Sequence, residues 1–433
     1  MLLYDSLSEK KKKVVQPNKG PLNFFVCGPT VYDHSHIGHA RTYIVFDTLV
    51  KYLRSQKMKV FYLQNITDID DKIINRAKLK KQDPKELAQQ FEKEYQRDMK
   101  ALGINSVDKY ARASTHMAQI KKQISTLIKK GFAYETDNGV YFEIKKFPRY
   151  GQLSKQNLNE LRAGWRIEPD LQKKDSMDFA LWKKTDMDWH FNSPWGKGRP
   201  GWHIEDTAIS EKYLGSQYDL HGAAVDLKFP HHESEIAQQE AASGKKPFVK
   251  IWLHAGFLLV NGEKMSKSAG NFITIKDFLK KYPANVMRMI VLSNHYRSPI
   301  NYTHKTAEQQ QAALDRIFNF FRTVTLKKEP KSLTALIKKA DKQFIAALES
   351  DFHTPKALAV IFSFISKAPK TKKSKQWISD KLKTLGFDFK IPKPTMKVNK
   401  MIKEREQLRQ QKQYEEADKL RKKMEVLGFL VED

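Results

Sequence analysis

The fold is decided by residues 23–67, which read NFFVCGPTVYDHSHIGHARTYIVFDTLVKYLRSQKMKVFYLQNIT. The run from Asn23 to Tyr32 predicts a strand that leads into a Gly-Pro turn. The run from Ile37 to Leu53 carries its apolar residues at helical spacing, and Lys59 to Thr67 predicts a second strand. A strand, a helix and a further strand favour a right-handed parallel unit. Ligands of such sheets bind outside the carboxyl ends of the strands, where Cys27 to His39 would lie.

The composition is that of a folded chain with two or three domains. Its 433 residues are 40% apolar and 11% aromatic, which excludes wholesale disorder. With 78 Lys and Arg against 49 Asp and Glu, the formal net charge is +29. This excess favours a polyanion as partner, because neutralised phosphates release their counterions. Nucleic acid is the first candidate and an acidic membrane surface the second, and composition alone does not separate them.

The chain is expected to be soluble and cytoplasmic. It has one cysteine, which excludes an internal disulfide and indicates a reducing compartment. The first residues, MLLYDSLSEKKKK, contain too short an apolar run for a signal peptide, and no later run is long enough to span a bilayer. We therefore expect no membrane partner.

The character of the chain changes along its length. Residues 193–206, SPWGKGRPGWHIED, are dense in turn formers and predict an ordered loop. Beyond about Tyr302 glycine becomes rare and helical periodicity dominates, and Lys367 to Lys375 reads as a solvated linker. A final helix or helix pair is marked by apolar residues at helical spacing: Ile402, Leu408, Ala417, Leu420, Met424 and Leu427.

Two short motifs are candidates for chemistry on phosphates. His36-Ile37-Gly38-His39 stands where the first helix begins, so its imidazoles would share a face at the positive end of the helix dipole and could donate hydrogen bonds to phosphoryl oxygens. Far downstream, residues 264–268 read KMSKS and offer two ammonium groups and two hydroxyls to a pyrophosphate leaving group. Taken singly, surface histidines and a solvated basic loop explain the two motifs as well.

In this order and separation the two motifs resemble the paired signatures of class I aminoacyl-tRNA synthetases. The surrounding sequence is similar to the cysteinyl-tRNA synthetase family over almost the whole chain, from Leu22 to the C-terminus. The resemblance is carried by CGPTVYDHSHIGHAR, NITDIDDKII, MDFALWK, SPWGKGRPGWHIE, FPHHESEIAQ, HYRSPINY and the ending EADKLRKKMEVLGFLVED.

The resemblance implies a two-step ligase. L-Cysteine would attack the α-phosphate of ATP, and the acyl group would then pass to the terminal ribose of tRNA(Cys), with Mg²⁺ accompanying ATP. By matching positions, the residues that would contact ATP or its pyrophosphate are His36, Gly38, His39, Asp226, Lys264, Ser266, Lys267 and Ser268. Trp202 and Thr67 would line the cysteine pocket. Such a scheme needs positioning and electrostatics rather than a covalent nucleophile.

The resemblance also implies one Zn²⁺ that binds the substrate thiolate. Cys27, His231 and Glu235 match three of the family's ligand positions, and His231 and Glu235 are spaced to share one helical face. Asp206 stands where the family pattern has a second cysteine. We favour ligation by Asp206 through oxygen. The alternatives are that Asp206 lies behind the ligands or that the site has lost its metal. A thiolate bond would separate cysteine from serine far better than shape alone.

Another departure concerns residues 221–227, HGAAVDL, where the family pattern is HGGGSDL. The side chains of Ala223, Ala224 and Val225 put in doubt the close backbone approach to ATP that glycine permits. Asp226 stays available for a ribose hydroxyl.

Two rival functions share these motifs. One is a ligase that joins activated cysteine to an amino sugar, which would need no tRNA-binding tail. The other is an RNA-binding paralogue without catalysis. The helical C-terminal region and the net charge argue against the first, and the intact histidine and lysine motifs argue against the second.

The sequence therefore predicts an α/β protein with three parts. A Rossmann-like catalytic domain would comprise residues 1–111 and 198–301 with a connection, and residues 112–197 would be an inserted domain for the acceptor end. An α-helical domain over residues 302–433 would bind the anticodon side of the tRNA. We expect a monomer.

Overall fold

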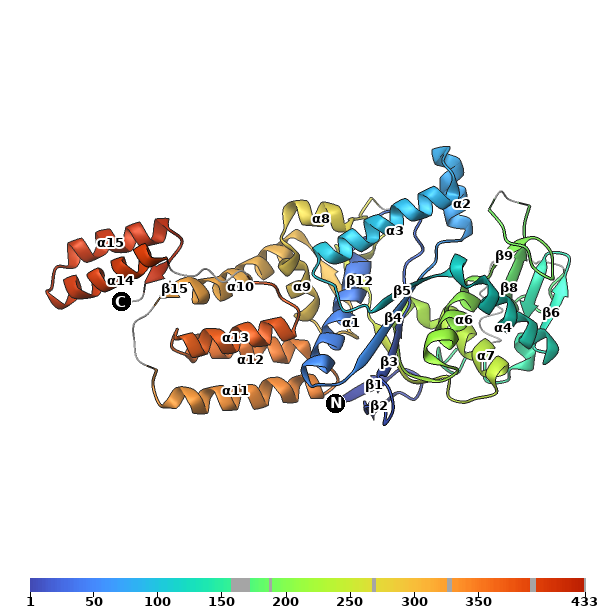
Figure 1. Ribbon diagram of the computed structural model, residues 1–433, viewed down its shortest axis with the longest axis horizontal. Helices are drawn as coiled ribbons and strands as arrows, with labels where there is room; N and C mark the ends of the chain where they lie inside the picture. Colours follow the sequence, from blue (N-terminus) through green and yellow to red (C-terminus); the bar gives the residue numbers. More distant parts are fainter. Residues whose placement is uncertain (157–171, 187–188, 267–269, 325–328, 390–394, 432–433) are drawn as a thin grey trace. The chain divides into compact units, whose positions relative to one another are not determined.

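The computed structural model describes residues 1–156, 172–186, 189–266, 270–324, 329–389 and 395–431 (Figure 1). The chain forms two compact units, residues 1–281 with 296–301 and residues 282–295 with 302–433. None of the helices in the described ranges is long and apolar enough to cross a membrane.

The first unit is built on a sheet of five parallel strands in the order β11-β10-β3-β4-β5. Their bounds are β3 Leu22–Val26, β4 Val60–Ile66, β5 Lys109–Arg112, β10 Tyr218–Ala224 and β11 Val249–Ala255. From β3 the chain builds outward through β4 and β5, and it later returns to the other side of β3 as β10 and β11. The predicted parallel unit and Rossmann-like fold class are confirmed.

Helix α1 (Ile37–Ser55) connects β3 to β4 and packs against β4, β10 and β11. Its Phe46 meets Phe24 of β3 edge to face at 5.5 Å, and Phe24 stacks on Tyr62 of β4 at 5.3 Å between ring centroids. Burial of this apolar stripe fixes the helix on the sheet. The other helices of this unit are α2 Asp71–Lys80, α3 Pro84–Ala101, α4 Met117–Lys129, α6 Trp202–Leu214, α7 His231–Ser243 and α8 Ile275–Lys281.

An antiparallel sheet lies between β5 and α6 in the sequence, with strand order β6-β7-β8-β9. Its strands are β6 Ala133–Thr136, β7 Gly139–Phe142, β8 Phe179–Lys184 and β9 Gly198–Pro200. The remaining strands of the first part of the chain are β1 Leu2–Asp5 with β2 Lys10–Lys13, and the three-stranded sheet of β12 Leu258–Val260, β13 Glu263–Lys264 and β14 Ile300–Tyr302. The boundaries of the inserted domain stay a prediction.

The segment 193–206 differs from the predicted loop. Residues 198–200 form β9, and Trp202 begins α6, with Gly201 as its N-cap residue. The glycines and prolines of this segment do mark a turn, but only before β9 begins at Gly198. The helix places Asp206 in its second turn, so the segment carries regular structure into the candidate site.

The second unit is helical within its described residues. Its helices are α9 Ala284–Leu292, α10 His304–Arg322, α11 Ser332–Glu349, α12 Thr354–Lys367, α13 Lys372–Thr384, α14 Met396–Gln410 and α15 Tyr414–Val426, and two short strands, β15 Thr323–Val324 and β16 Leu430–Val431, pair in parallel. Helices α11 and α12 pack together, and Phe364 of α12 lies 4.2 Å from Trp377 of α13 between ring centroids.

The predicted linker over 367–375 is wrong. Lys367 ends α12, and Thr371 caps α13 by accepting the backbone N–H of Ser374, so four residues connect two packed helices. The lysines mislead because they occupy the exposed side of α13, whose buried side is carried by Trp377, Ile378 and Leu382.

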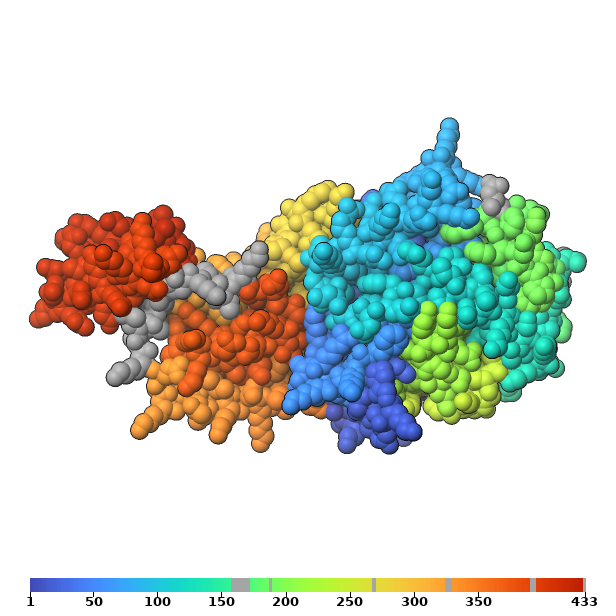
Figure 2. Space-filling model, viewed as in Figure 1, coloured from blue at the N-terminus to red at the C-terminus, as the bar shows by residue number. Residues whose placement is uncertain are grey.

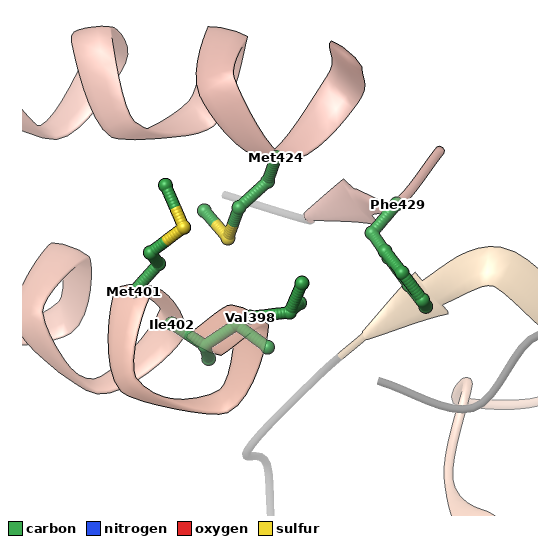
Figure 3. Close-up of a cluster of buried hydrophobic side chains, with 5 residues drawn as sticks. All are labelled: Val398, Met401, Ile402, Met424 and Phe429. Atoms are coloured by element: carbon green, nitrogen blue, oxygen red, sulfur yellow. The ribbon is translucent and has the colours of Figure 1, made fainter. Parts of the chain in front are cut away.

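The predicted final helix pair is confirmed as the hairpin of α14 and α15, drawn in red in Figure 2. Its small core consists of Val398, Met401, Ile402, Met424 and Phe429 (Figure 3). Leu420 packs against this core. Two methionines fill much of this core, and their flexible side chains fit irregular gaps between helices.

Candidate functional site

A cavity of about 360 Å³ opens at the carboxyl ends of the parallel strands. The chain leaves β3 toward β4 and later enters β10 on the opposite side of β3, so the strand order reverses between β3 and β10. Crevices at such reversal points are the usual ligand sites of open parallel sheets. Among the residues that line the cavity are Cys27, His36, Gly38, His39, Trp202, Asp226 and Lys264.

The turn after β3 holds Cys27 against the neighbouring strand. Gly28 donates its backbone N–H to Asn65 Oδ1 at 2.6 Å, and a Cβ at residue 28 would lie 1.7 Å from the Asn65 carbonyl oxygen. Only glycine permits this approach. Asn65 also donates from Nδ2 to Asp206 Oδ1 at 2.5 Å, so one amide fixes both Gly28 and Asp206.

The two imidazoles of residues 36–39 cap helix α1. The Gly38 N–H donates to His36 Nδ1 at 3.1 Å, and the His36 N–H donates to His39 Nδ1 at 3.3 Å. Because both Nδ1 atoms accept, each neutral ring carries its proton on Nε2 and can donate from there. The rings stack at 3.8 Å between centroids, and a Cβ at Gly38 would collide with the His36 ring. Burial, together with His36, lowers the pKa of His39 well below its usual value.

The basic motif is described only in part. Lys264 ends β13, is exposed and lines the cavity. Ser266 donates its backbone N–H to Asn271 Oδ1 at 2.9 Å and does not line the cavity. Lys267 and Ser268 lie outside the described residues.

The four predicted metal ligands come together. One ligand atom from each of Cys27, Asp206, His231 and Glu235 lies within 4.8 Å of the others, and all four residues are buried. His231 Nε2 is 3.1 Å from Asp206 Oδ2 and 2.9 Å from Glu235 Oε1. We call these four residues the outer set. The helical spacing of residues 231 and 235 in α7 is confirmed.

A second group overlaps the outer set. Cys27, His221, His232 and Glu235 also offer ligand atoms within 4.8 Å of one another, and we call them the inner set. The Nε2 atoms of His221 and His232 each lie 3.2 Å from Cys27 Sγ. Both sets therefore share one sulfur and one carboxylate.

The surroundings raise the pKa values of both Cys27 and His231 in the outer set. Burial raises the pKa of the Cys27 thiol, and the carboxylates of Glu235 and Asp206 raise it further. Burial alone would lower the pKa of His231, but the same carboxylates outweigh it and raise the pKa to about 9. A divalent cation bound by these atoms would replace the protons that the shifts retain.

The ligand types and the burial of the outer set suit a zinc ion. Neither carboxylate oxygen of the fully buried Glu235 accepts a hydrogen bond, although His231 Nε2 is at ion-pair distance. Such an unsatisfied buried carboxylate is costly unless a cation or donor meets it. Thiolate, imidazole and carboxylate are the three ligand types that zinc takes in proteins.

The remaining predicted pocket residues lie at different depths. Trp202 lines the cavity and stacks on His231 at 4.0 Å between centroids, whereas Asp226 is exposed at the rim within a 3-10 turn. Thr67 is fully buried, donates its hydroxyl to Glu205 Oε2 at 3.1 Å and does not line the cavity. The role of Thr67 in cysteine binding stays a prediction.

Sequence reasoning missed His221 as a neighbour of Cys27. The one signal is a histidine in the middle of a predominantly buried strand, YDLHGAA, where it pairs with β3 two residues before Cys27. Glu205 was missed as well. It is fully buried, and burial together with Asp206 raises its pKa well above the usual value.

Comparisons with known proteins agree with this geometry. Residues 13–312 match the family described as tRNA synthetases class I (C) catalytic domain, and residues 343–390 match the DALR domain. The chain is 41% identical over 465 residues to a cysteine–tRNA ligase of Thermococcus gammatolerans, covering 100% of this chain and 97% of that one. It is 43% identical to a cysteine–tRNA ligase of Methanococcus maripaludis with the same coverage.

A solved structure supports the fold at low sequence identity. A methionyl-tRNA synthetase of Mycobacterium tuberculosis in complex with methionyl-adenylate superposes with a TM-score of 0.63 and 16% identity, covering 85% of this chain and 89% of that chain. The parallel sheet, the two nucleotide-side motifs and the matches over the full chain lead to one conclusion: the chain belongs to the cysteine–tRNA ligases, a family of class I aminoacyl-tRNA synthetases.

Proposed function

We propose that this enzyme activates L-cysteine with ATP and transfers it to the terminal ribose of tRNA(Cys), and that a zinc ion in the outer set selects cysteine by its thiol. The observation that carries the proposal is the buried outer set, whose Cys27 reaches the same cavity as the two histidines of the α1 cap. Amino acid and nucleotide contacts are thereby adjacent. ATP is a substrate here, and Mg²⁺ would accompany it.

The α1 cap would hold the phosphates of ATP. His36 and His39 use their Nδ1 atoms in the helix cap and carry the ring proton on Nε2, and the N-terminus of α1 adds its dipole. Neutral donors can follow the charge that develops on the α-phosphate without first losing a proton. Lys264 would meet the departing pyrophosphate, with Lys267 and the serines of residues 264–268 beside it, and Asp226 would accept from a ribose hydroxyl.

Zinc, when bound by Cys27, Asp206, His231 and Glu235, would supply a strong bond to a substrate thiolate that serine cannot match. Asn65 orients Asp206 for this role, and Trp202 stacks on His231 and closes the cavity side of the set. A shape-only pocket would separate the two amino acids by only about 1–3 kcal/mol. We favour Asp206 as a ligand over the two alternatives raised by its place in the sequence.

The helical second unit supports transfer to tRNA rather than to a small acceptor. Residues 343–390 match the DALR domain, and the chain carries a net charge of +29. Positive helices suit a phosphate backbone. The domain boundaries, a monomeric state and a cytoplasmic location stay predictions.

The test is cysteine-dependent ATP–pyrophosphate exchange together with charging of tRNA(Cys), measured with the zinc content of the same samples. Asp206→Asn keeps the shape but removes the charge. We expect it to lower the zinc affinity measured in the presence of cysteine about 10-fold or more and to weaken the preference for cysteine over serine. Asp137→Asn, an exposed carboxylate on the inserted region, is the matched control.

Full exchange activity after complete removal of zinc would overturn the selection mechanism. ATP–pyrophosphate exchange without charging of tRNA(Cys) would overturn the proposal that tRNA(Cys) is the acceptor.

A further inference from the structure

The inner set has the orientation of a ligand cluster. His221 and His232 come from different elements, β10 and α7, yet both turn Nε2 to Cys27 Sγ at 3.2 Å. Glu235 Oε2 lies 3.6 Å from His221 Nε2, and all four residues are buried. One sulfur, two imidazole nitrogens and one carboxylate oxygen make a complete tetrahedral donor set for zinc.

Hydrogen-bond partners on the Nδ1 side hold both imidazoles of the inner set in this orientation. His221 Nδ1 is 2.7 Å from the Tyr218 hydroxyl, and His232 Nδ1 is 2.9 Å from His254 Nε2. His254 Nδ1 in turn lies 2.8 Å from Ser6 Oγ. Both hydroxyls can accept, so the protons can all stand on the Nδ1 atoms and leave an Nε2 lone pair on each ring for a cation. Metal-binding histidines are held by such partners in proteins generally.

A second observation points to a cation independently. Glu235 is fully buried, its carboxylate oxygens accept no hydrogen bond, and it is shared by both sets. Asp206 accepts a hydrogen bond from Asn65 at 2.5 Å, and His231 Nε2 lies between the two carboxylates, 3.1 Å from Asp206 Oδ2 and 2.9 Å from Glu235 Oε1. The other oxygen of Glu235, Oε2, faces His221 at 3.6 Å and accepts no hydrogen bond, so its unused ligand capacity lies on the side of the inner set.

The two sets face different surroundings. His221 stacks on Trp252 at 4.4 Å between centroids, His232 lies tilted against the same ring at 5.0 Å, and Trp252 is fully buried. His231 stacks instead on Trp202, which lines the cavity. An ion in the inner set would thus lie on the core side of Cys27, and an ion in the outer set would lie on the cavity side.

We propose that Cys27, His221, His232 and Glu235 form a second, inner position for a divalent cation of the zinc type, and that the ion rests there in the protein without amino acid. With one zinc ion per chain the two positions are alternatives, and because they share the sulfur of Cys27 and the carboxylate of Glu235 the ion can pass from one to the other without losing these two ligands. With four protein ligands the inner position is closed, as structural zinc sites are. This inference deepens the proposed function and rests on the metal part of it.

The test is X-ray absorption at the zinc edge on the full chain loaded with one equivalent of zinc, without cysteine. We expect one sulfur and two imidazoles around the ion. His232→Gln should lower the count to one imidazole, as should His221→Asn, and should weaken zinc binding about 10-fold or more. His304→Gln, an exposed histidine on α10, is the matched control. One imidazole in the unaltered protein and the same count in His232→Gln would overturn the inference.

A crystal structure of the unaltered protein with an anomalous difference map removes any dependence on the folding of the variants. A peak within about 2.0–2.1 Å of Nε2 of both His221 and His232 supports the inner position at full or partial occupancy. A peak bonded only to His231 and Asp206 overturns it and leaves the proposed function intact. No zinc at either position overturns both metal proposals, while cysteine-dependent exchange on the same sample tests the ligase separately.

Discussion

The imidazoles of His36 and His39 serve the helix and the proposed chemistry with different atoms. His36 Nδ1 accepts the backbone N–H of Gly38, and His39 Nδ1 accepts the backbone N–H of the N-cap residue His36, so the proton of each neutral ring is on Nε2. The helix cap therefore fixes the tautomer of both rings, whereas a surface histidine outside such a cap can exchange its tautomers. Donors held in this way can stabilise the charge that rises on a phosphate during the reaction.

Lys264 allows a prediction at the scale of one residue. Its side chain is exposed, so its removal should lower the activity without changing the stability of the fold. Lys264→Ala should lower cysteine-dependent ATP–pyrophosphate exchange about 100-fold, since a charge aimed at the departing pyrophosphate is removed. The circular dichroism spectrum and the unfolding midpoint should not change. A loss of exchange that is accompanied by unfolding would assign the lysine to the fold instead.

At the scale of residues, the sequence predicted the outer set better than the inner one. The family resemblance supplied Cys27, His231 and Glu235 as ligands, and the helical spacing of residues 231 and 235 agreed with it. His221 reaches Cys27 only because β10 pairs with β3, and strand order is a non-local property. The Asn65 contact to Asp206 spans 141 residues and has no local signature either.

Arg41 connects helix α1 by hydrogen bonds to backbone segments that are distant in the sequence. At the scale of elements, we predict that its removal destabilises the protein. Its guanidinium is almost fully buried and donates to the carbonyl oxygens of Gly256, Tyr296 and Ser298. Arg41→Met would remove the side-chain donor from all three oxygens, of which Tyr296 O keeps the backbone N–H of Gly256, and should lower the free energy of unfolding by about 3–5 kcal/mol in urea titrations. Arg97→Met, on the exposed side of α3, is the control and should change it by less than about 0.5 kcal/mol.

Asp98 in α3 gives a prediction on pH. Burial, and then the neighbouring Glu94, raise the pKa of Asp98 to about 6. A carboxyl whose pKa is raised by folding stabilises the protein below its unfolded value and loses that contribution as the pH rises through about 6. Asp98→Asn should therefore stabilise the protein by about 1–2 kcal/mol at pH 7 and have no such effect at pH 3.5. Equal effects at both values would contradict the shift.

The sequence predicted the helices and strands whose apolar residues repeat at a regular spacing. It did not predict those in segments whose composition is typical of loops or linkers. The strands and helix of residues 23–67 and the final hairpin were predicted because their apolar residues repeat at one spacing. The segment over 193–206 contains β9 and the start of α6 despite its glycines, because backbone pairing with β8 overrides turn propensity there. The lysines of 367–375 belong to α12, α13 and a short connection, since a solvated helix face has the same composition as a linker.

Because the whole molecule is strongly positive, we expect salt to affect the transfer to tRNA much more than the activation of cysteine. Binding of tRNA neutralises phosphates and releases counterions, whereas cysteine and ATP meet a small cavity. Raising the salt from about 50 to 200 mM should increase the KM for tRNA about 100-fold and change cysteine-dependent exchange by less than about threefold. Equal salt dependence of both activities would show that the net charge of +29 is not directed at tRNA.

The whole chain contains a single thiol, and that thiol belongs to both ion positions. Peroxide that converts Cys27 to a sulfenic acid would remove the sulfur donor from either arrangement in one event. No neighbouring cysteine exists to trap the oxidised atom as an internal disulfide, so recovery depends on an external reductant. Protein synthesis that depends on this enzyme would then slow down under oxidative stress because a single sulfur atom has been oxidised.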